Sequence, residues 1–367
     1  MFDDLDTDRR PLVLVWEVTQ ACGLACRHCR ADARPRRHPD ELTTAEGKRL
    51  LEETAAFGDG QLVVLSGGDP LARDDLTELV AHGDDLGLRM TITPSGTRSL
   101  TPERVRDLGD AGIARMALSL DGPTGERHDA FRGEESYADT VAAARAARDA
   151  GIPLQVNTTV CADTVDDLPA IRDRVRDLGA VLWSAFFLVP VGRGRVLDPV
   201  TPERAEEVMA WLHDVSDEER FGVKTTEAPF YRRVGIQRAE AGGADAGAGR
   251  RGGITAGRGF AFVSHTGEVY PSGFLPESAG NVRDRSVVDV YRNADLFESL
   301  RDPDGFSGKC GACEFRHVCG GSRSRAHAVT GDPTGSDPLC PYVPDGHDGP
   351  LPERQRGDDG GRSEPAD

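Results

Sequence analysis

Three cysteines near the N-terminus stand at a spacing that could hold a metal centre. They are Cys22, Cys26 and Cys29, in the stretch Cys-Gly-Leu-Ala-Cys-Arg-His-Cys. Thiolates are soft ligands, and a compact group of them favours an iron–sulfur cluster, zinc or copper. A structural zinc ion or an electron-transfer cluster takes four protein ligands, whereas a cubane held by three thiolates leaves one iron free for a small molecule. The alternatives are a purely structural role, or zinc with a distant fourth ligand.

A second group of cysteines lies near the C-terminus. Its members are Cys310, Cys313 and Cys319, with Cys340 twenty-one residues further on. Four thiolates make a closed site for either a 4Fe–4S cluster or a zinc ion. The chain has eight cysteines, so at most one all-cysteine cluster fits beside the first group. The remaining one, Cys161, is solitary in the sequence, and we expect it to be a buried packing residue.

The elements that must position these cysteines follow a repeating pattern of short apolar runs and longer helical stretches. The runs predict strands at 12–18, 62–65, 89–93, 115–120, 154–160 and 181–188. Helices are expected near 44–57, 74–87, 102–109, 137–150, 166–178 and 201–217. Alternating strands and helices imply a parallel sheet, and six units are too few to close an eight-fold barrel. The fold class is therefore α/β, an open partial (βα)6 barrel with function on the loops after its strands.

The loop after the second expected strand carries a glycine-rich motif. It reads Ser66, Gly67, Gly68, Asp69 and Pro70. Two glycines let backbone approach a ligand closely, and Asp69 supplies a carboxylate. Alone, Gly-Gly-Asp-Pro is a common turn. Its place about 40 residues after the cysteines and behind a strand makes it a candidate binding loop.

Further polar residues lie at the same end of the expected sheet. Ser95 and Ser119 follow or end the third and fourth strands, where a helix-capping turn is an equally good explanation. Asn157 is inward-facing on the fifth strand, where a ligand contact and a structural hydrogen bond are equally open. After the sixth strand, a Gly-Arg-Gly-Arg loop places Arg193 and Arg195 where they can bind a carboxylate, with a solvated turn as the alternative.

The first cysteine motif resembles the signature of the radical S-adenosylmethionine (SAM) enzymes. The resemblance covers residues 11–342, although the family usually has Glu where this chain has Asp69. The second cysteine group is similar to the SPASM and twitch extensions, which hold auxiliary iron–sulfur clusters. The stretches Cys-Arg-His-Cys-Arg-Ala, Ser-Gly-Gly-Asp-Pro and Cys-Glu-Phe-Arg-His-Val-Cys-Gly-Gly look most like the haem and d1-haem biosynthesis branch. Relatives there often have a further cysteine where this chain has Ser322.

The resemblance implies a role for each motif. The first three cysteines would hold a 4Fe–4S cluster whose open iron is chelated by SAM, which is cleaved to a 5′-deoxyadenosyl radical. The second group would hold an auxiliary 4Fe–4S cluster, which the family analogy favours over zinc. The residues expected to contact SAM are Ser66, Gly67, Gly68, Asp69, Ser95, Ser119, Asn157 and Arg193.

Charge and hydropathy exclude several classes of partner. The net charge of −18 argues against nucleic-acid binding. No apolar run approaches the roughly 18 residues of a membrane span, and the acidic N-terminus is no signal peptide, so we expect a cytoplasmic protein. Only three of the 44 basic residues are lysines, namely Lys48, Lys224 and Lys309, against 62 acidic residues. This composition suits molar salt and a halophile, although a GC-rich genome also favours arginine.

Taken together, these observations predict a radical SAM enzyme with one auxiliary cluster. The expected substrate is a tetrapyrrole in haem-pathway side-chain modification or decarboxylation, with a reduced ferredoxin or flavodoxin as electron donor. The propionates of the tetrapyrrole would contact Arg193, Arg195, Arg232 or Arg233. One alternative is a peptide or protein maturase of the SPASM type, and a distant one is a non-catalytic iron–sulfur electron carrier.

The expected organisation has a barrel at 11–220, an auxiliary-cluster region at 221–343 and a disordered acidic tail at 344–367. A mobile loop is expected at 239–259, because it is rich in Gly and Ala. The next stretch, 259–270, predicts a β-hairpin in which His265 is a turn residue.

Overall fold

A ten-stranded sheet forms the centre of the computed structural model, which describes residues 6–243 and 253–352. The strand order is β10-β9-β8-β1-β2-β3-β4-β5-β6-β7, and the strands from β8 and β1 to β7 run parallel. The strand bounds are β1 Val13–Thr19, β2 Leu62–Gly67, β3 Arg89–Ile92, β4 Arg115–Ser119, β5 Leu154–Val160, β6 Leu182–Phe187, β7 Gly222–Thr226, β8 Phe260–Val263, β9 Glu268–Tyr270 and β10 Gly280–Asn281.

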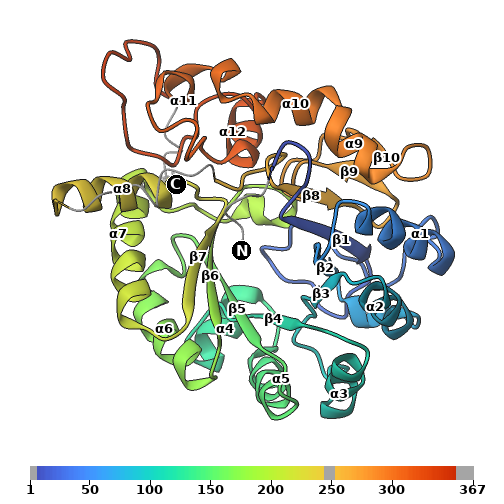
Figure 1. The fold of residues 1–367 in the computed structure, drawn as a ribbon. Coiled ribbons are helices and arrows are strands. Elements are labelled where there is room, and N and C mark those ends of the chain that lie inside the picture. Colours follow the sequence, from blue (N-terminus) through green and yellow to red (C-terminus); the bar gives the residue numbers. More distant parts are fainter. Residues whose placement is uncertain (1–5, 244–252, 353–367) are drawn as a thin grey trace, which may run out of the picture.

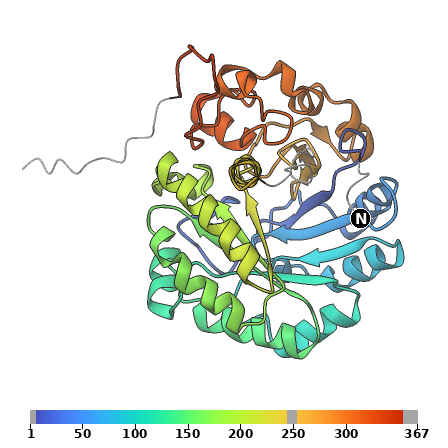
Figure 2. The same cartoon turned by 60° about the vertical axis from the view of Figure 1, so that its left-hand side comes forward.

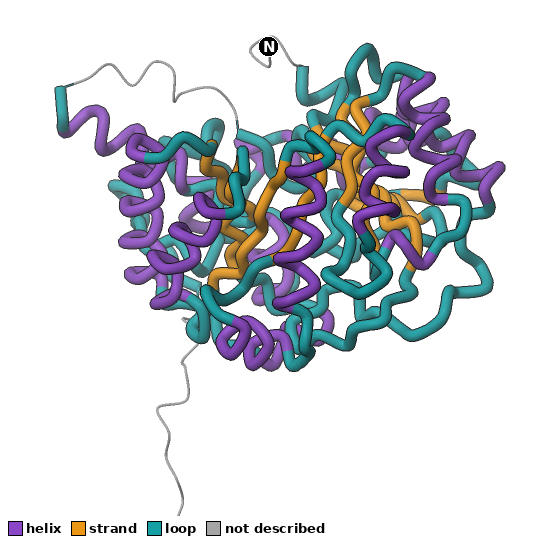
Figure 3. Tube along the Cα trace, turned by 90° about the horizontal axis from the view of Figure 1, so that it is seen from below, coloured by secondary structure: helices purple, strands orange, loops and turns teal. Residues whose placement is uncertain are grey.

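Helices surround the curved sheet on its outer side (Figure 1). Helices α9 to α12 fill the sector between α8 and α1, beside β8 and β9 (Figures 1 and 2). Viewed from below, the strands lie enclosed by helices and loops (Figure 3). The helix bounds are α1 Thr44–Ala55, α2 Leu76–Asp85, α3 Pro102–Asp110, α4 Gly125–Arg132, α5 Tyr137–Asp149, α6 Leu168–Asp177, α7 Pro202–Glu218, α8 Tyr231–Ala241, α9 Val287–Asn293, α10 Asp295–Arg301, α11 Gly308–Ala312 and α12 Arg323–Thr330.

The predicted α/β fold with a parallel central sheet is confirmed, and each of the six expected strands is present as β1 to β6. One parallel strand, β7, was missed, and a second, β8, was expected only as part of a hairpin. β7 contains Lys224 and has little apolar character, so its periodic signal is weak. β8 does form the expected hairpin with β9, but it also pairs in parallel with β1, which lies about 250 residues earlier. Helix α4 was also missed, because it starts on Gly125 and carries few apolar residues.

Threonine caps fix where the helices begin after several of the loops. Thr43 forms a capping box with Glu46 at α1. Thr101, Thr124 and Thr201 each accept a hydrogen bond from the third backbone N–H of α3, α4 and α7. Such a cap satisfies a helix donor that has no partner within the helix. The caps therefore define the lengths of the loops that carry polar residues.

Side chains alternate between the two faces of the parallel strands. On β1, Leu14 and Trp16 are fully buried in the core under the helices, whereas Val13 and Val15 face the other way and are half-buried. On β2, Val63 and Leu65 show the same contrast with their neighbours. The core therefore lies between sheet and helices, and the inward face of the partial barrel keeps contact with solvent.

The sheet continues beyond the expected boundary at residue 220, since β7 to β10 join it. The division into regions at 11–220 and 221–343 stays a prediction. The expected loop at 239–259 and tail at 344–367 fall partly outside the described residues, and α8 extends into the loop as far as Ala241. Within 6–243 and 253–352, no helix has both the length and the apolar character needed to cross a membrane.

Candidate functional site

The three N-terminal cysteines lie in the loop that follows β1. Cys26 is buried, whereas Cys22 and Cys29 are partly exposed. The Cys22 thiol is 3.4 Å from Ser95 Oγ and accepts a hydrogen bond from the backbone N–H of Leu24 at 3.4 Å. The backbone N–H of Cys29 donates to the carbonyl of Cys26 at 3.2 Å. This turn keeps Cys26 and Cys29 close together in one short loop with Cys22.

The environment of these thiols fits iron ligands. Burial raises the pKa of Cys22, and the neighbouring Asp69 and Cys29 add to the increase. Burial likewise raises the pKa of Cys26, with Cys29 and Cys22 contributing. Free thiolates are therefore unfavourable here, whereas a coordinated thiol is deprotonated by its metal. The donor set is three soft ligands in a loop, as a cluster with one open iron needs.

The glycine-rich loop after β2 packs directly against the start of the cysteine loop. The backbone N–H of Gly68 donates to the carbonyl of Thr19 at 2.8 Å, and that of Asp69 donates to the carbonyl of Ala21 at 2.6 Å. A Cβ on Gly67 or Gly68 would lie 2.3 Å from one of these carbonyl oxygens. The glycines thus permit a close approach to the protein's own backbone, whereas the sequence predicted an approach to a ligand.

Gly68→Ala is expected to destabilise the protein by about 1–3 kcal/mol, because the new Cβ overlaps the backbone of Ala21 and that backbone must shift. Gly23→Ala is the matched control in the same region, since a Cβ there meets nothing within 4 Å. The measurement is anaerobic denaturant unfolding together with iron content. Equal midpoints for the two variants would show that the close packing of these loops is unimportant.

Asp69 holds the next loop in place. Its carboxylate accepts hydrogen bonds from the backbone N–H groups of Leu71 (3.2 Å) and Ser95 (3.4 Å) and from the Thr97 hydroxyl (3.1 Å). Burial raises the pKa of this carboxyl. Ser95 Oγ donates to the Gly68 carbonyl at 2.9 Å. The loops after β2 and β3 are therefore joined beside Cys22, and a SAM contact by Asp69 or the partly exposed Ser66 stays a prediction.

Arg193 braces the cysteine loop from the loop after β6. Its Nε donates to the Cys26 carbonyl at 2.9 Å and its Nη1 to the Ala33 carbonyl at 3.1 Å. Its backbone N–H donates to the Cys29 carbonyl at 3.0 Å. Its buried Nη2 has no hydrogen-bond partner within the described chain. Arg193 thus lies at the site as expected, but most of its guanidinium is used to position the cysteines.

Ser119 and Asn157 face each other across the pair formed by β4 and β5. The amide oxygen of Asn157 accepts a hydrogen bond from Gln155 Nε2 at 2.7 Å, so part of its polarity is satisfied by the protein. Both residues are half-buried on the inward face. The structure therefore places these expected SAM contacts inside the barrel, and their role toward SAM stays a prediction.

A buried ion pair beside Cys26 was not predicted from the sequence. Arg132 Nη2 donates to Cys26 Sγ at 3.3 Å, and its Nη1 donates to Asp121 Oδ2 at 2.9 Å. Burial opposes ionisation of Asp121, but the charges of His28 and Arg132 hold the pKa of this carboxyl below its usual range. Asp121 follows β4, and Arg132 ends helix α4, which the sequence did not predict.

Arg132→Met is expected to lower the free energy of unfolding by about 3–5 kcal/mol, because it leaves the buried Asp121 carboxylate without its main partner. Arg127→Met removes an arginine from the same helix that pairs with Asp167 in an exposed position, and it should change stability by less than about 1 kcal/mol. Anaerobic guanidinium titrations compare the two. Similar losses in both variants would contradict a special role for the buried pair.

His265 is in a turn after β8, as predicted, but it also contacts the inward-facing Glu17. Its Nδ1 lies 2.7 Å from Glu17 Oε1, and Arg30 of the cysteine loop donates to the other oxygen of the same carboxylate. Burial would raise the pKa of Glu17, yet Arg30 and His265 hold it below its usual range. Arg30 Nη1 also donates to the Gly273 carbonyl at 3.2 Å. The C-terminal region therefore fixes the end of the cysteine loop.

The second cysteine group gathers as the sequence predicted. Cys310, Cys313, Cys319 and Cys340 line one cavity of about 20 Å³, together with Gly320 and Gly321. Burial raises the pKa of Cys319 well above its usual value and that of Cys340 to about 11. Among the described residues, those of this site included, no three His, Cys, Asp or Glu side chains lie close enough together to hold a single ion. The four cysteines instead lie around the small cavity described above.

Cations surround these thiols. Arg323 Nη2 lies 3.5 Å from Cys310 Sγ, and Arg233 Nη2 lies 3.7 Å from Cys340 Sγ. Arg233 is buried and also paired with Glu206, so it serves the cysteine site and is not free for a substrate propionate. Lys309 donates to the Cys340 carbonyl. The positive charges of these side chains would offset the negative charges of thiolates in a site largely withdrawn from water.

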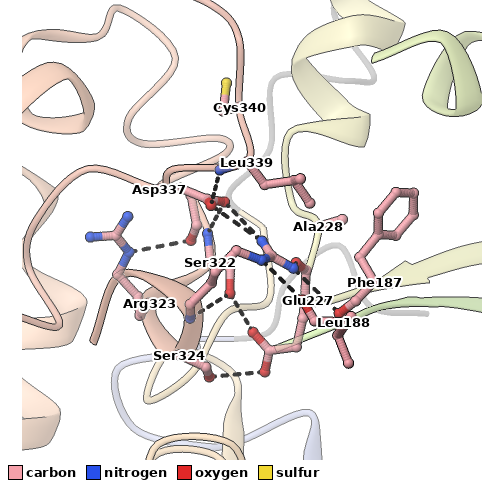
Figure 4. Close-up of polar contacts among 12 residues, drawn as sticks. Phe187, Leu188, Glu227, Ala228, Ser322, Arg323, Ser324, Asp337, Leu339 and Cys340 are labelled. Atoms are coloured by element: carbon pink, nitrogen blue, oxygen red, sulfur yellow. Dashed lines mark hydrogen bonds and ion pairs between the residues drawn. The ribbon is translucent and has the colours of Figure 1, made fainter. Parts of the chain in front are cut away.

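A polar network joins the second cysteine group to the barrel (Figure 4). Glu227 follows β7 in the left-handed region (φ 56°) and accepts hydrogen bonds from the hydroxyls of Ser322 at 2.6 Å and Ser324 at 2.9 Å. Arg325 donates to the carbonyls of Phe187, Leu188 and Glu227 and pairs with Asp337. Ser322 is the N-cap of α12, so its hydroxyl is directed to Glu227 and the helix.

The comparisons with known proteins agree with this arrangement. The radical SAM superfamily profile matches residues 16–175. The AdoMet-dependent heme synthase of Methanosarcina barkeri is 40% identical over 341 residues, 91% of this chain and 97% of that protein. The Fe-coproporphyrin III synthase of the same organism is 30% identical over 359 residues, 91% and 88% of the two chains. Streptococcus suis SuiB bound to S-adenosylmethionine shares the fold, with a TM-score of 0.71 at 15% identity over 91% and 78% of the chains.

The fold and the three-thiol loop define the class: the chain belongs to the radical SAM superfamily and is a radical SAM enzyme. Membership implies a 4Fe–4S cluster and SAM as cofactors. Within that class, the similarity to the heme synthase extends over nearly the full length of that relative.

Proposed function

We propose that this enzyme converts propionate side chains of an iron porphyrin into vinyl groups. The observation that supports this most is the 40% identity to an AdoMet-dependent heme synthase, spread over 97% of that protein. Converting one propionate to a vinyl group removes CO2, one hydrogen atom and one electron. The hydrogen atom comes from an unactivated C–H bond, which calls for radical chemistry.

We propose that Cys22, Cys26 and Cys29 hold the cluster that, with SAM, supplies the 5′-deoxyadenosyl radical for that hydrogen abstraction. The chain's own residues do the positioning. Arg193 and the Gly67–Gly68 backbone hold the cysteine loop, and the buried Arg132 offsets the charge on Cys26. The expected SAM contacts from Ser119 and Asn157 line the inward face below it. Holding the reacting groups in fixed geometry lowers the entropic part of the barrier.

We also propose that the second cysteine group holds an auxiliary 4Fe–4S cluster. Four thiols around a cavity with adjacent cations suit a redox centre, and such a centre can take up the electron released by decarboxylation. The proposed electron donor for SAM cleavage is a reduced ferredoxin or flavodoxin, and the proposed location is the cytoplasm.

The test is anaerobic turnover of the reconstituted enzyme with SAM, a reductant and Fe-coproporphyrin III. The expected products are 5′-deoxyadenosine and a porphyrin that has lost CO2 and two hydrogens from each modified side chain, measured by liquid chromatography and mass spectrometry. Formation of 5′-deoxyadenosine with every porphyrin unchanged would refute the proposed substrate. That result would favour a peptide substrate instead.

A further inference from the structure

Two buried cations beside the second cysteine group form no ion pair with a carboxylate of the described residues. Lys309 is 5% exposed and Arg323 is 0% exposed. The Lys309 ammonium donates to the carbonyl of Cys340, and the Arg323 guanidinium donates to three backbone carbonyls. A buried charge without a counter-charge is costly, so these two side chains need a negative group close to them.

Sulfur atoms of the second cysteine group lie next to these cations. Arg323 Nη2 is 3.5 Å from Cys310 Sγ, and the backbone N–H of Asp337 donates to the same sulfur at 3.3 Å. The backbone N–H of Gly321 donates to Cys319 Sγ at 3.4 Å. The site is therefore built from donors and positive charge directed at sulfur, as an anionic thiolate centre requires.

Lys309 acts on another thiol of the group. Burial raises the pKa of Cys340, and the charges of Arg233 and Lys309 oppose this increase. The residues that line the cavity include Arg233, Lys309 and Arg316 but no Asp or Glu of the described chain. Each of the two buried cations thus has a thiol, and not a carboxylate, as the neighbour that can carry negative charge.

Most other charges around the second group are already balanced. The arginines paired with carboxylates are Arg233 with Glu206, Arg316 with Asp304 and Arg325 with Asp337. Asp332 accepts hydrogen bonds from Ser307 and Thr334 and is not within ion-pair distance of Arg323. Glu314 is exposed and bonds to Tyr342. The positive charges of Lys309 and Arg323 are therefore a surplus at this site.

The first cysteine group is surrounded by a different balance of charge. Arg132, which donates to one of its thiols, is paired with Asp121 at 2.9 Å. Arg193, which donates to the carbonyls of its loop, lies 3.5 Å from Asp32. The Asp69 carboxyl adds a further acidic group on the same side. The two arginines that brace this group from the barrel therefore bring no surplus of positive charge.

This contrast has a consequence for the reduction potentials of the two sites. The potential of an iron–sulfur centre depends on the net charge around it and on hydrogen bonds to its sulfur atoms. One-electron reduction adds a negative charge, which fixed cations in a site withdrawn from water stabilise. Lys309 and Arg323 should therefore make the second site the easier one to reduce. The first site keeps the low potential that reductive cleavage of SAM needs.

We infer that Lys309 and Arg323 are positioning residues that raise the reduction potential of the second centre, and so direct to it the electron that the substrate releases. This inference rests on the proposed function. After hydrogen abstraction, the side-chain radical loses CO2 and one electron and becomes a vinyl group. The electron passes to the second centre in its oxidised form and from there to a one-electron carrier protein.

The experiment is an anaerobic redox titration of the reconstituted full chain, followed by electron paramagnetic resonance. Lys309→Met and Arg323→Met should each lower the midpoint potential of the second centre. The expected change in its reduction equilibrium is about tenfold, which is about 59 mV for a one-electron couple. The midpoint of the first centre, measured in the same samples, should not change. The signal of the second centre is identified in Cys26→Ala, where the first centre is lost.

Two further variants separate charge from packing. Lys48→Met removes a surface lysine that pairs with Glu78 at 2.7 Å, and it should move neither midpoint. Arg323→Lys keeps the positive charge, so its midpoint should lie closer to that of the wild type than to that of Arg323→Met. Iron content should stay at about eight atoms per chain in all these variants except Cys26→Ala, because every thiol is retained.

Each remaining outcome contradicts a definite part of the proposal. Unchanged midpoints at full iron content in both methionine variants would overturn the inference and leave the auxiliary cluster standing. Equal shifts in Arg323→Lys and Arg323→Met would overturn it as well, because packing would then explain the effect. Loss of iron from both methionine variants would assign the cations to assembly of the site instead. A wild type with about four iron atoms and one signal would overturn the auxiliary cluster together with the inference.

Discussion

Replacing Cys26 by alanine is expected to abolish formation of 5′-deoxyadenosine. Cys26 is the buried member of the three-thiol loop and the acceptor of the Arg132 hydrogen bond, so its loss removes one of three iron ligands and leaves a buried guanidinium without its sulfur partner. With two thiolates the open iron position is no longer defined. The expected fall in activity is about a thousandfold or more, to the detection limit, since the radical has no other source.

Cys161→Ala is the matched control for this variant. Cys161 is fully buried in an apolar cluster with Phe131, Leu188 and Leu197, as expected for a packing residue. Its substitution removes a thiol of similar burial without touching either cysteine group. Iron content and 5′-deoxyadenosine formation should both stay near wild-type levels. Wild-type activity in Cys26→Ala would remove the basis for a cluster at this loop.

The second large effect is expected for Cys313→Ala. Iron content should fall from about eight to about four atoms per chain, because one of two four-iron sites can no longer be closed by four thiolates. Porphyrin turnover should be lost, whereas cleavage of SAM should persist in uncoupled form. The physical reason is that the cavity of the second group is lined by Cys310, Cys313, Cys319 and Cys340 and by none of the three N-terminal cysteines.

Elemental analysis and product quantification on the same sample check this result, again beside Cys161→Ala. Full iron content together with normal turnover in Cys313→Ala would refute the auxiliary cluster. Zinc in place of iron in the wild type would refute it independently, and the three-thiol loop would be unaffected by that outcome.

Much of the fold could be predicted because the strands of a parallel sheet are nearly continuous apolar runs. β1, β2 and β6 are of this kind, whereas β5 alternates between apolar and polar residues. The two cysteine groups could be recognised from their spacing alone. β7 was missed because its five residues are half-buried or exposed and Val223 is its one apolar side chain, so it shows no apolar run. The partnership of β8 with β1 was missed because pairing over such a distance leaves no local trace in the sequence.

The grouping of the cysteines could be predicted from the sequence, whereas the residues that support them could not. Thiol spacing is a local property, so both cysteine groups were found. Arg132 and Glu227 act through contacts with residues far along the chain, and nothing near them in the sequence marks this role. Asp69 and Arg193 were expected to bind a ligand, but most of their polar atoms bind neighbouring loops.

The pairing of β1 with β8 has a consequence for the newly made protein. β1 is among the first segments to leave the ribosome, yet its second edge stays open until residues 260–263 emerge, about 12–50 s later at 5–20 residues per second. The Arg30 contact with Gly273 comes later still. Until then the thiol loop lacks one of its walls. Iron delivery in the cell should accordingly follow release of the finished polypeptide, and chains truncated before β8 should accumulate without metal.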